Sequence, residues 1–139
     1  MVVLDTNVLL ESLRPFPSPS VVAWFQATSR SSIYTTSITM AEILYGIALL
    51  PEGGRKRVLT DAAGKIFEVD LADRILDFTE DAARAYARIM AARRAGGRPM
   101  SGLDAMIAAI ALSRKASLAT RNTRDFDGCG LRLVNPFSE

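Results

Sequence analysis

Four acidic residues occupy positions where an acid is unusual: Asp5, Glu42, Asp104 and Asp125. Asp5 directly follows the apolar run Met1–Leu4, which is typical of a buried strand in a parallel sheet. An ionised carboxylate at such a place is costly unless a partner compensates its charge. Carboxylates that converge without a base favour a hard cation such as Mg²⁺ or Mn²⁺ over zinc. Such a site activates water and neutralises a phosphodiester during hydrolysis.

The absence of histidine narrows the chemistry further. The 139 residues contain no histidine and one cysteine, Cys129. The composition therefore excludes Ser–His and Cys–His nucleophile pairs, histidine acid–base catalysis, an internal disulfide and zinc ligated by histidine or cysteine. Any hydrolysis must use carboxylates, hydroxyls, amines or a hard metal ion. A reducing cytoplasm fits this cysteine usage.

Three of the acids also have a purely structural explanation. Thr39-x-x-Glu42 and Ser101-x-x-Asp104 have the spacing of a capping box, in which the acid bonds back to the amide of the cap residue. An acid in the first helical turn also complements the helix dipole. For Asp125 the structural alternative is an ordinary acid of a surface loop.

The positions of the four acids along the chain nevertheless favour convergence. Asp5 and the segment Thr120–Phe126, which contains the fourth acid, each follow a predicted strand. Glu42 and Asp104 each fall in the first turn of a predicted helix, after a strand or a loop. Because ligands of open α/β sheets bind at the carboxyl ends of the strands, we expect the four acids to face one edge of the sheet.

The apolar pattern predicts strands that alternate with helices. Strands are expected over residues 1–4, 33–36, 75–78, 117–120 and 131–134, with a further extended piece at 67–69. Helices are expected over residues 8–13, 21–28, 39–49, 55–65, 80–94 and 105–112, with a polar loop at 121–130. Thr6 or Asn7 is expected to cap the first helix, and Thr79 the fifth. This alternation predicts one α/β domain over residues 1–139, with a parallel sheet between helical layers.

Charge is distributed unevenly along the chain. The formal net charge is +2, but residues 84–139 hold ten Lys+Arg and four Asp+Glu and carry +6, whereas residues 1–83 carry −4. Arginine dominates the basic half, and its guanidinium suits phosphate contact. A solvated helix face explains the same charges equally well. We expect neither a membrane span nor a signal peptide, because no apolar run approaches ~18 residues and Asp5 interrupts the first run.

Five short segments carry a family resemblance: Leu4–Asn7, Thr39–Gly46, Gly102–Ala109, Ala119–Phe126 and Leu133–Phe137. Each segment alone is unspecific, whereas five in order at family-like spacing are specific, and they span essentially the whole chain. They make the chain resemble a PIN-domain ribonuclease, in particular a VapC-type toxin of a bacterial toxin–antitoxin pair close to the FitB-like branch. The resemblance implies a PIN-like three-layer α/β/α sandwich with a central parallel sheet, and a Mg²⁺- or Mn²⁺-dependent endoribonuclease.

The resemblance also implies roles for single residues. Asp5, Glu42 and Asp104 match its invariant acids, and the fourth acid falls on Asp125 or at the position of Asn122. Asp5 and Asp104 would hold the metal, with Glu42 and Asp125 ligating through water or a second ion. The products would be a 5′-phosphate and a 3′-hydroxyl. Supporting roles fall on Thr6 and Asn7, which would brace Asp5, and on Thr120, which would border the site.

Contacts to the RNA backbone are expected from basic side chains of the second half of the chain. The candidates are Arg93, Arg94, Arg98, Arg121 and Arg124. Such contacts would make RNA binding depend on salt. They would not identify the RNA, because backbone contacts carry no sequence information.

Protein partners are implied by the same resemblance. It implies a homodimer that is inhibited by a cognate antitoxin protein and that reaches operator DNA only through this antitoxin. The antitoxin groove would be bordered by the helices near Val21–Phe25 and Glu42–Leu49. The candidate contacts are Trp24, Phe25, Tyr45 and Leu49, although core packing is the commoner fate of such side chains.

Two rival functions fit part of this pattern. A nucleolytically inactive PIN module would use the same acidic pocket to bind an antitoxin or a nucleic acid, for example by receiving an arginine of the partner. Magnesium titration separates the two, because a binding module shows no metal-dependent turnover. A dinucleotide-binding domain is excluded, because Asp5-Thr6-Asn7 follows the first strand where G-x-G-x-x-G would be needed.

Overall fold

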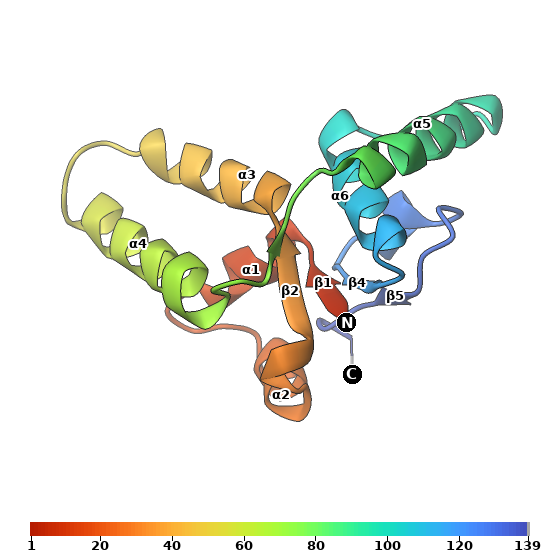
Figure 1. Ribbon diagram of the computed structural model, residues 1–139. Coiled ribbons are helices and arrows are strands. Elements are labelled where there is room, and N and C mark those ends of the chain that lie inside the picture. Colours follow the sequence, from red (N-terminus) through yellow and green to blue (C-terminus); the bar gives the residue numbers. More distant parts are fainter. Residues whose placement is uncertain (139) are drawn as a thin grey trace.

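The central element of the fold is one sheet of five parallel strands (Figure 1). The structure is a computed structural model that describes residues 1–138. The strands are β1 (Val2–Leu4), β2 (Ile33–Thr36), β3 (Ile75–Leu76), β4 (Ser117–Ala119) and β5 (Leu133–Val134). Their order across the sheet is β3-β2-β1-β4-β5, and each neighbouring pair is parallel. The predicted parallel sheet is confirmed, and β2 has the predicted bounds.

Helices connect these strands. They are α1 (Thr6–Ser12), α2 (Pro19–Ala27), α3 (Ser37–Ala48), α4 (Gly54–Lys65), α5 (Glu80–Ala95) and α6 (Gly102–Ser113). Short 3-10 turns cover Arg30–Ser32 and Thr123–Phe126, the second within the predicted polar loop. Thr79 caps α5 as predicted, and its hydroxyl accepts from the amide of Ala82 over 3.2 Å. Within the described chain, no helix combines the length and apolar character needed to cross a membrane.

The extended piece predicted at residues 67–69 was wrong. Ile66–Asp70 instead form one turn of π-helix that continues α4. The wide turn buries Phe67 in the core, and the amide of Leu71 closes it by donating to the carbonyl of Ile66 over 2.8 Å. Burial of a side chain of this size contributes about 1.5–3 kcal/mol, which outweighs the weak strand preference of the local sequence.

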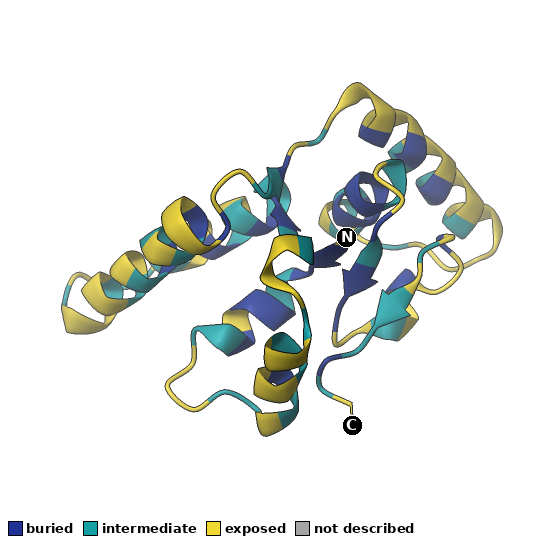
Figure 2. Ribbon diagram, turned by 60° about the horizontal axis from the view of Figure 1, so that its bottom comes forward, coloured by how far each residue is buried: buried dark blue, intermediate teal, exposed yellow. Residues whose placement is uncertain are grey.

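The alternation of side chains along β1 divides the core in two. Val3 packs with residues of α5 and α6, whereas Val2 and Leu4 pack with residues of α1, α3 and α4 on the opposite face. Figure 2 shows the buried residues gathered along the strands and the inner sides of the helices, with exposed residues on the outer sides. The molecule is therefore the predicted three-layer α/β/α sandwich.

Helix α6 is the most deeply buried helix of its layer. Ala105, Ile107, Ala108, Ala109 and Ile110 are each at most 1% exposed. Small alanine side chains let α6 approach both the sheet and α5 closely, and large aliphatic side chains fill the remaining space. Asp104 directly precedes this buried stretch, in the first turn of α6.

β1 lies where the order of the strands reverses. The chain passes from β1 to β2 and β3 on one side and returns to β4 and β5 on the other. The amide of Asp5 still donates to the carbonyl of Ala119 over 2.9 Å, so the ladder between β1 and β4 reaches the residue after β1. Open α/β sheets bind ligands outside the carboxyl ends of their strands at such a reversal.

Candidate active site

Asp5 forms the centre of the site at the carboxyl end of β1. Its side chain is 4% exposed and also caps α1, because Oδ1 accepts from the amide of Thr6 over 2.8 Å. Its Oδ2 accepts from the hydroxyl of Thr120 over 2.7 Å. The prediction that Thr6 or Asn7 caps this helix was wrong: Asp5 is itself the residue with extended backbone before the first turn, so its own carboxylate reaches the free amide.

Burial raises the pKa of Asp5 from 3.8 to about 6. The hydrogen bonds from Thr120 and from the amide of Thr6 act in the opposite direction, because they stabilise the ionised form. The negative charges of Asp104 and Glu42 add to the rise. Three of the predicted acids therefore lie within electrostatic reach of one another, although they come from separate parts of the chain.

Glu42 enters the site through a contact with α1. The capping-box alternative for Glu42 is excluded, because α3 begins two residues earlier than expected and Thr36 is its cap, accepting from the amide of Thr39 over 3.0 Å. Glu42 consequently lies in the second turn of α3. Its Oε1 accepts from the hydroxyl of Thr6 over 2.8 Å, and this contact explains the acid better than capping does.

Thr39 is a residue of the site that the sequence analysis missed. It is fully buried, and its hydroxyl lies 3.1 Å from the hydroxyl of Thr6. Since the hydrogen of Thr6 is donated to Glu42, Thr39 must be the donor to Thr6. The only sequence signal was the position of Thr39 three residues before Glu42, which was interpreted as a cap.

Asp104 combines both interpretations considered for it. Ser101 caps α6 as predicted, and its hydroxyl accepts from the amide of Asp104 over 3.1 Å. Burial raises the pKa of the half-buried Asp104 carboxyl, a hydrogen bond with Ser101 lowers it, and the charge of Asp125 raises it. The capping role therefore does not remove Asp104 from the acidic site.

Asp125 lies in the 3-10 turn beyond β4 and is exposed. Its effect on the pKa of Asp104 places its charge close to that acid. Asn122, the alternative for the fourth position, is exposed and takes part through its amide, which donates to the hydroxyl of Thr120 over 3.1 Å. Asp125 thus adds a negative charge near Asp104, and the residue that fills the fourth position stays a prediction.

Thr120 and Asn7 link the two strand ends. Thr120 is fully buried, donates to Asp5 and lies 3.5 Å from the side-chain nitrogen of Asn7, which donates to it. The side-chain oxygen of Asn7 accepts from the amide of Arg121 over 3.2 Å. The predicted supporting residues Thr6, Asn7 and Thr120 thus all make contacts within the site.

The donor set fits a hard cation by its chemistry. All four acids offer oxygen, the type of ligand that Mg²⁺ and Mn²⁺ prefer, and burial raises the pKa of Asp5, to which the charges of Asp104 and Glu42 add. Within residues 1–138, no group of three or more His, Cys, Asp or Glu side chains is gathered closely enough to hold an ion by direct contact. Direct ligation would therefore involve fewer than three of the acids as they lie.

The predicted RNA-binding arginines fall into two groups. Arg94 and Arg124 are exposed, and Arg121 stacks on the ring of Phe137 at 4.7 Å from its centroid. Arg93 and Arg98 instead direct their guanidinium groups at backbone carbonyls of neighbouring loops.

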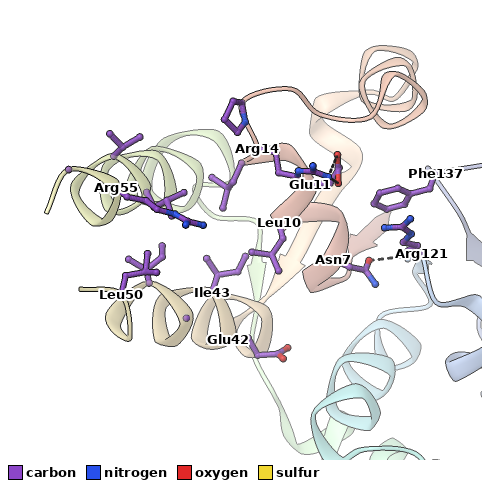
Figure 3. A pocket seen from close by; sticks show the side chains of 17 residues that line it. Asn7, Leu10, Glu11, Arg14, Glu42, Ile43, Leu50, Arg55, Arg121 and Phe137 are labelled. Carbon is purple, nitrogen blue, oxygen red and sulfur yellow. Dashed lines mark hydrogen bonds and ion pairs between the residues drawn. The ribbon is translucent and has the colours of Figure 1, made fainter. Parts of the chain in front are cut away.

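A groove of about 840 Å³ adjoins the acidic site and runs between α1, α3 and α4 (Figure 3). Its lining residues are Asn7, Leu10, Glu11, Leu13, Arg14, Pro15, Glu42, Ile43, Gly46, Ile47, Leu50, Gly54, Arg55, Val58, Leu59, Arg121 and Phe137. Asn7 and Glu42 belong to both the groove and the acidic site. The groove is therefore mainly apolar and has acidic and basic groups along it.

The antitoxin groove expected beside Val21–Phe25 and Glu42–Leu49 stays a prediction, and the groove found here borders only the second of these segments. Its walls come from α3, α1 and α4, whereas Trp24 and Phe25 of α2 are half-buried and pack against the core cluster on this face of the sheet. Tyr45 and Leu49 are exposed and are not among its lining residues. The reason is the rotation of α3, which turns Ile43 and Ile47 rather than Tyr45 and Leu49 toward α1 and α4.

Similarity to known proteins agrees with this geometry. Residues 2–128 match the family described as PIN domain. VapC ribonuclease Y4jK of Sinorhizobium fredii is 37% identical over 138 residues, which are 99% of this chain and 98% of that protein. Toxin FitB of Neisseria gonorrhoeae is 37% identical over 139 residues, the whole of both chains. A chain in the structure of FitAB bound to the IR36 DNA fragment superposes with a TM-score of 0.94 at 37% identity, covering 100% of this chain and 97% of that chain. The chain therefore belongs to the PIN-domain family and, within it, to the VapC-type toxins of toxin–antitoxin systems near the FitB-like branch.

Proposed function

We propose that the protein is a Mg²⁺- or Mn²⁺-dependent endoribonuclease whose activity is inhibited by a cognate antitoxin. The observation that carries this proposal is the buried carboxylate of Asp5, whose pKa is raised further by the negative charges of Asp104 and Glu42. Its hydrogen bonds come from neutral groups, the amide of Thr6 and the hydroxyl of Thr120. A divalent cation would balance such a group. The ribonuclease name of a relative that is 37% identical over nearly the whole chain supports the reaction class.

In this mechanism the four acids have two different roles. Asp5 and Asp104 would hold the ion, and Glu42 and Asp125 would ligate through water or hold a second, weaker ion. When bound, the ion would supply a lowered pKa of water and neutralise charge on the phosphodiester. A neighbouring carboxylate accepts the proton of the attacking water.

The threonines set the orientation of these acids. The hydroxyl of Thr120 and the amide of Thr6 fix the two oxygens of Asp5, and the hydroxyl of Thr6 fixes Glu42. Preorganised groups of this kind reduce the rearrangement needed when charge develops in the transition state.

The groove is the proposed binding surface for the antitoxin. Its apolar lining from Ile43, Ile47 and Leu59 suits an apolar segment, and Glu42 at the shared border suits a basic side chain. A solved structure of FitAB, a complex of a similar toxin, supports a protein partner of this kind. An occupant that reaches Glu42 would block the acidic site, so binding and inhibition would occur together.

Assembly and DNA contact remain part of the proposal. We propose a homodimer, which size-exclusion chromatography with light scattering would test; a monomer at high concentration would contradict it. Operator DNA would be bound only through the antitoxin, which gel-shift measurements with and without the antitoxin would test.

The decisive experiment compares the wild type with Asp5→Asn and with the control Asp61→Asn, an exposed acid of α4. RNA cleavage is measured during titration with Mg²⁺ or Mn²⁺ and after removal of metal with a chelator. We expect cleavage by the wild type and the control that depends on metal, and a loss of at least about 100-fold in Asp5→Asn. Full metal-dependent cleavage by Asp5→Asn would contradict the assignment.

The same titration tests the inactive binding module as the alternative. If the wild type shows no turnover at any metal concentration, and acid variants lose only affinity for the antitoxin, the binding module is the correct function. Sequencing the ends of cellular RNA after induction, with Asp5→Ala as the control, would identify the RNA that is cut.

A further inference from the structure

Arg93 connects the loop that precedes Asp104 with the segment that carries Asp125. Its Nε donates to the carbonyl of Arg98 over 2.6 Å, and its Nη1 donates to the carbonyl of Asp127 over 2.5 Å. The first carbonyl lies in the loop between α5 and α6, and the second lies just beyond the 3-10 turn that follows β4. One guanidinium therefore joins two segments that are separate in sequence.

Arg98 completes this junction from the opposite loop. Its Nη2 donates to the carbonyl of Arg124 over 3.4 Å, and its Nη1 lies 3.6 Å from Oδ2 of Asp127. The amide of Arg98 donates to the carbonyl of Arg93 over 2.8 Å, so the loop before α6 is closed on itself. The carbonyls of residues 124 and 127 stand on either side of Asp125. We call Arg93, Arg98 and Asp127 the arginine clasp.

We infer that the arginine clasp positions Asp125 beside Asp104, and that Arg93 and Arg98 act as positioning residues rather than as contacts to RNA. This inference rests on the proposed function, since it assigns the two arginines a part in assembling the acidic site. The clasp contacts the segments on which both acids depend. It binds the loop that leads to Ser101, the cap of α6 before Asp104, and it binds the turn that carries Asp125.

The turn that carries Asp125 is fixed by its own contacts only through the buried ring of Phe126. Phe126 is 1% exposed and packs in the core between the sheet and α6. Asp125 itself faces solvent, and its amide makes one short-range bond, to the carbonyl of Asn122 over 3.0 Å. The clasp fixes the exposed side of the turn, because Arg98 donates to the carbonyl of Arg124 before Asp125 and Arg93 donates to the carbonyl of Asp127 after it.

Arginine suits this task better than lysine does. A planar guanidinium directs several N–H groups at fixed angles, so two carbonyls that it binds together are fixed in both distance and orientation. The single ammonium of lysine keeps the charge but loses this geometry. The N–H groups of Arg93 and Arg98 that point at carbonyls are also withdrawn from phosphate contact, whereas Arg94 makes no such bond to a carbonyl among the described residues.

The test uses Arg93→Lys and Arg98→Lys, which keep the charge, and Arg88→Lys as the matched control. Arg88 is an exposed arginine on the same helix, outside the clasp and the site. Four quantities are measured: amide hydrogen exchange over residues 122–129, Mn²⁺ affinity by calorimetry without RNA, RNA affinity in chelator at several salt concentrations, and kcat and KM for a model RNA.

We expect faster exchange in residues 122–129 for both clasp variants, by about tenfold, and a fall in Mn²⁺ affinity of up to about tenfold, as is common for residues that orient metal ligands. Values of kcat should fall while KM changes less than about twofold. RNA affinity and its salt dependence in chelator should stay as in the wild type, and Arg88→Lys should match the wild type throughout.

The opposite pattern would overturn the inference. If RNA affinity and its salt slope fall while exchange and Mn²⁺ affinity are unchanged, Arg93 and Arg98 bind RNA. If Arg93→Lys fails to fold, Arg98→Lys alone decides, because it leaves the two bonds of Arg93 to carbonyls in place. Failure of the proposed function is seen separately, as a wild type without metal-dependent cleavage, whereas the exchange measurement still reports on the clasp.

Discussion

Thr120 donates its hydroxyl hydrogen to Oδ2 of Asp5 over 2.7 Å, and this bond joins the residues that follow β4 and β1. Thr120 is fully buried, and its hydroxyl oxygen accepts from the amide of Asn122 over 3.1 Å. The bond to Asp5 favours the ionised carboxylate and so opposes part of the pKa rise that burial causes. One hydroxyl thus sets both the geometry and the charge of the central acid.

Replacement of Thr120 by valine keeps the shape of the side chain and removes this bond. We expect the pKa of Asp5 to rise above its present value of about 6, so the acid limb of the activity profile should move to higher pH. The free energy of unfolding should fall by about 1–3 kcal/mol, because the amide of Asn122 also loses its acceptor. Thr120→Ser should restore both quantities. An acid limb that stays in place in the valine variant would contradict this role.

The raised pKa of Asp5 also makes the metal-free protein less stable at neutral pH. The folded protein holds the proton more tightly than the unfolded chain, with a pKa of about 6 against 3.8, so this group favours folding below about pH 4 and the advantage is lost as the pH rises to about 6. The whole effect is about 3 kcal/mol.

Asp5→Asn is neutral at every pH and should therefore be more stable than the wild type by up to about 3 kcal/mol at neutral pH in chelator, with little difference near pH 4. Urea unfolding at both pH values measures this, with Asp61→Asn as the exposed control. An equal difference at both pH values would show that burial of the charge is not its cause.

Thr39 should affect turnover although it does not reach the acids directly. Its hydroxyl donates to Thr6, which donates to Glu42, so Thr39→Val leaves Thr6 without its donor. We expect kcat to fall about tenfold, equivalent to about 1.4 kcal/mol, with KM for RNA little changed. Thr39→Ser should restore kcat. A loss confined to thermal stability would reduce Thr39 to a packing role.

Glu11 lies in the wall of the groove and should stabilise the protein in a way that depends on pH. The amide of Ser18, which donates to Glu11 over 2.8 Å, lowers the pKa of this carboxyl below its ordinary 4.5, and Arg14 adds to the effect. A lowered pKa gives stability that is present at neutral pH and is lost as the pH falls through the folded value. Glu11→Gln should therefore have a lower Tm than the wild type at pH 7, and the difference should shrink in acid. A constant difference would contradict this assignment.

Arg94 should contribute to RNA binding through its charge alone. It is exposed near the end of α5, unlike Arg93, which binds two carbonyls. We expect Arg94→Ala to weaken RNA binding. The slope of log affinity against log salt should become shallower by about 1, as for the loss of one phosphate contact. Fluorescence anisotropy in chelator measures this without cleavage. An unchanged slope would remove Arg94 from the RNA surface.

Most of the fold could be predicted because the signals are local. The β-branched and aromatic segment Ile33–Thr36 and the caps Thr79 and Ser101 each depend on a few neighbouring residues, and the structure confirms them. The errors arose where a distant contact decided between local alternatives. Residues 66–70 form a π-helical turn that buries Phe67 in the core, and Glu42 accepts from Thr6 while Thr36 caps α3.

By itself, the sequence determined the family, through the order of its segments, and the composition of the candidate site, with four acids and no histidine. Only the tertiary structure decided what each side chain contacts. The bond from Thr120 to Asp5 spans 115 positions, that from Thr6 to Glu42 spans 36, and that from Arg93 to the carbonyl of Asp127 spans 34. No local pattern encodes such pairs, because they form only when separate strands and helices have packed at one edge of the sheet.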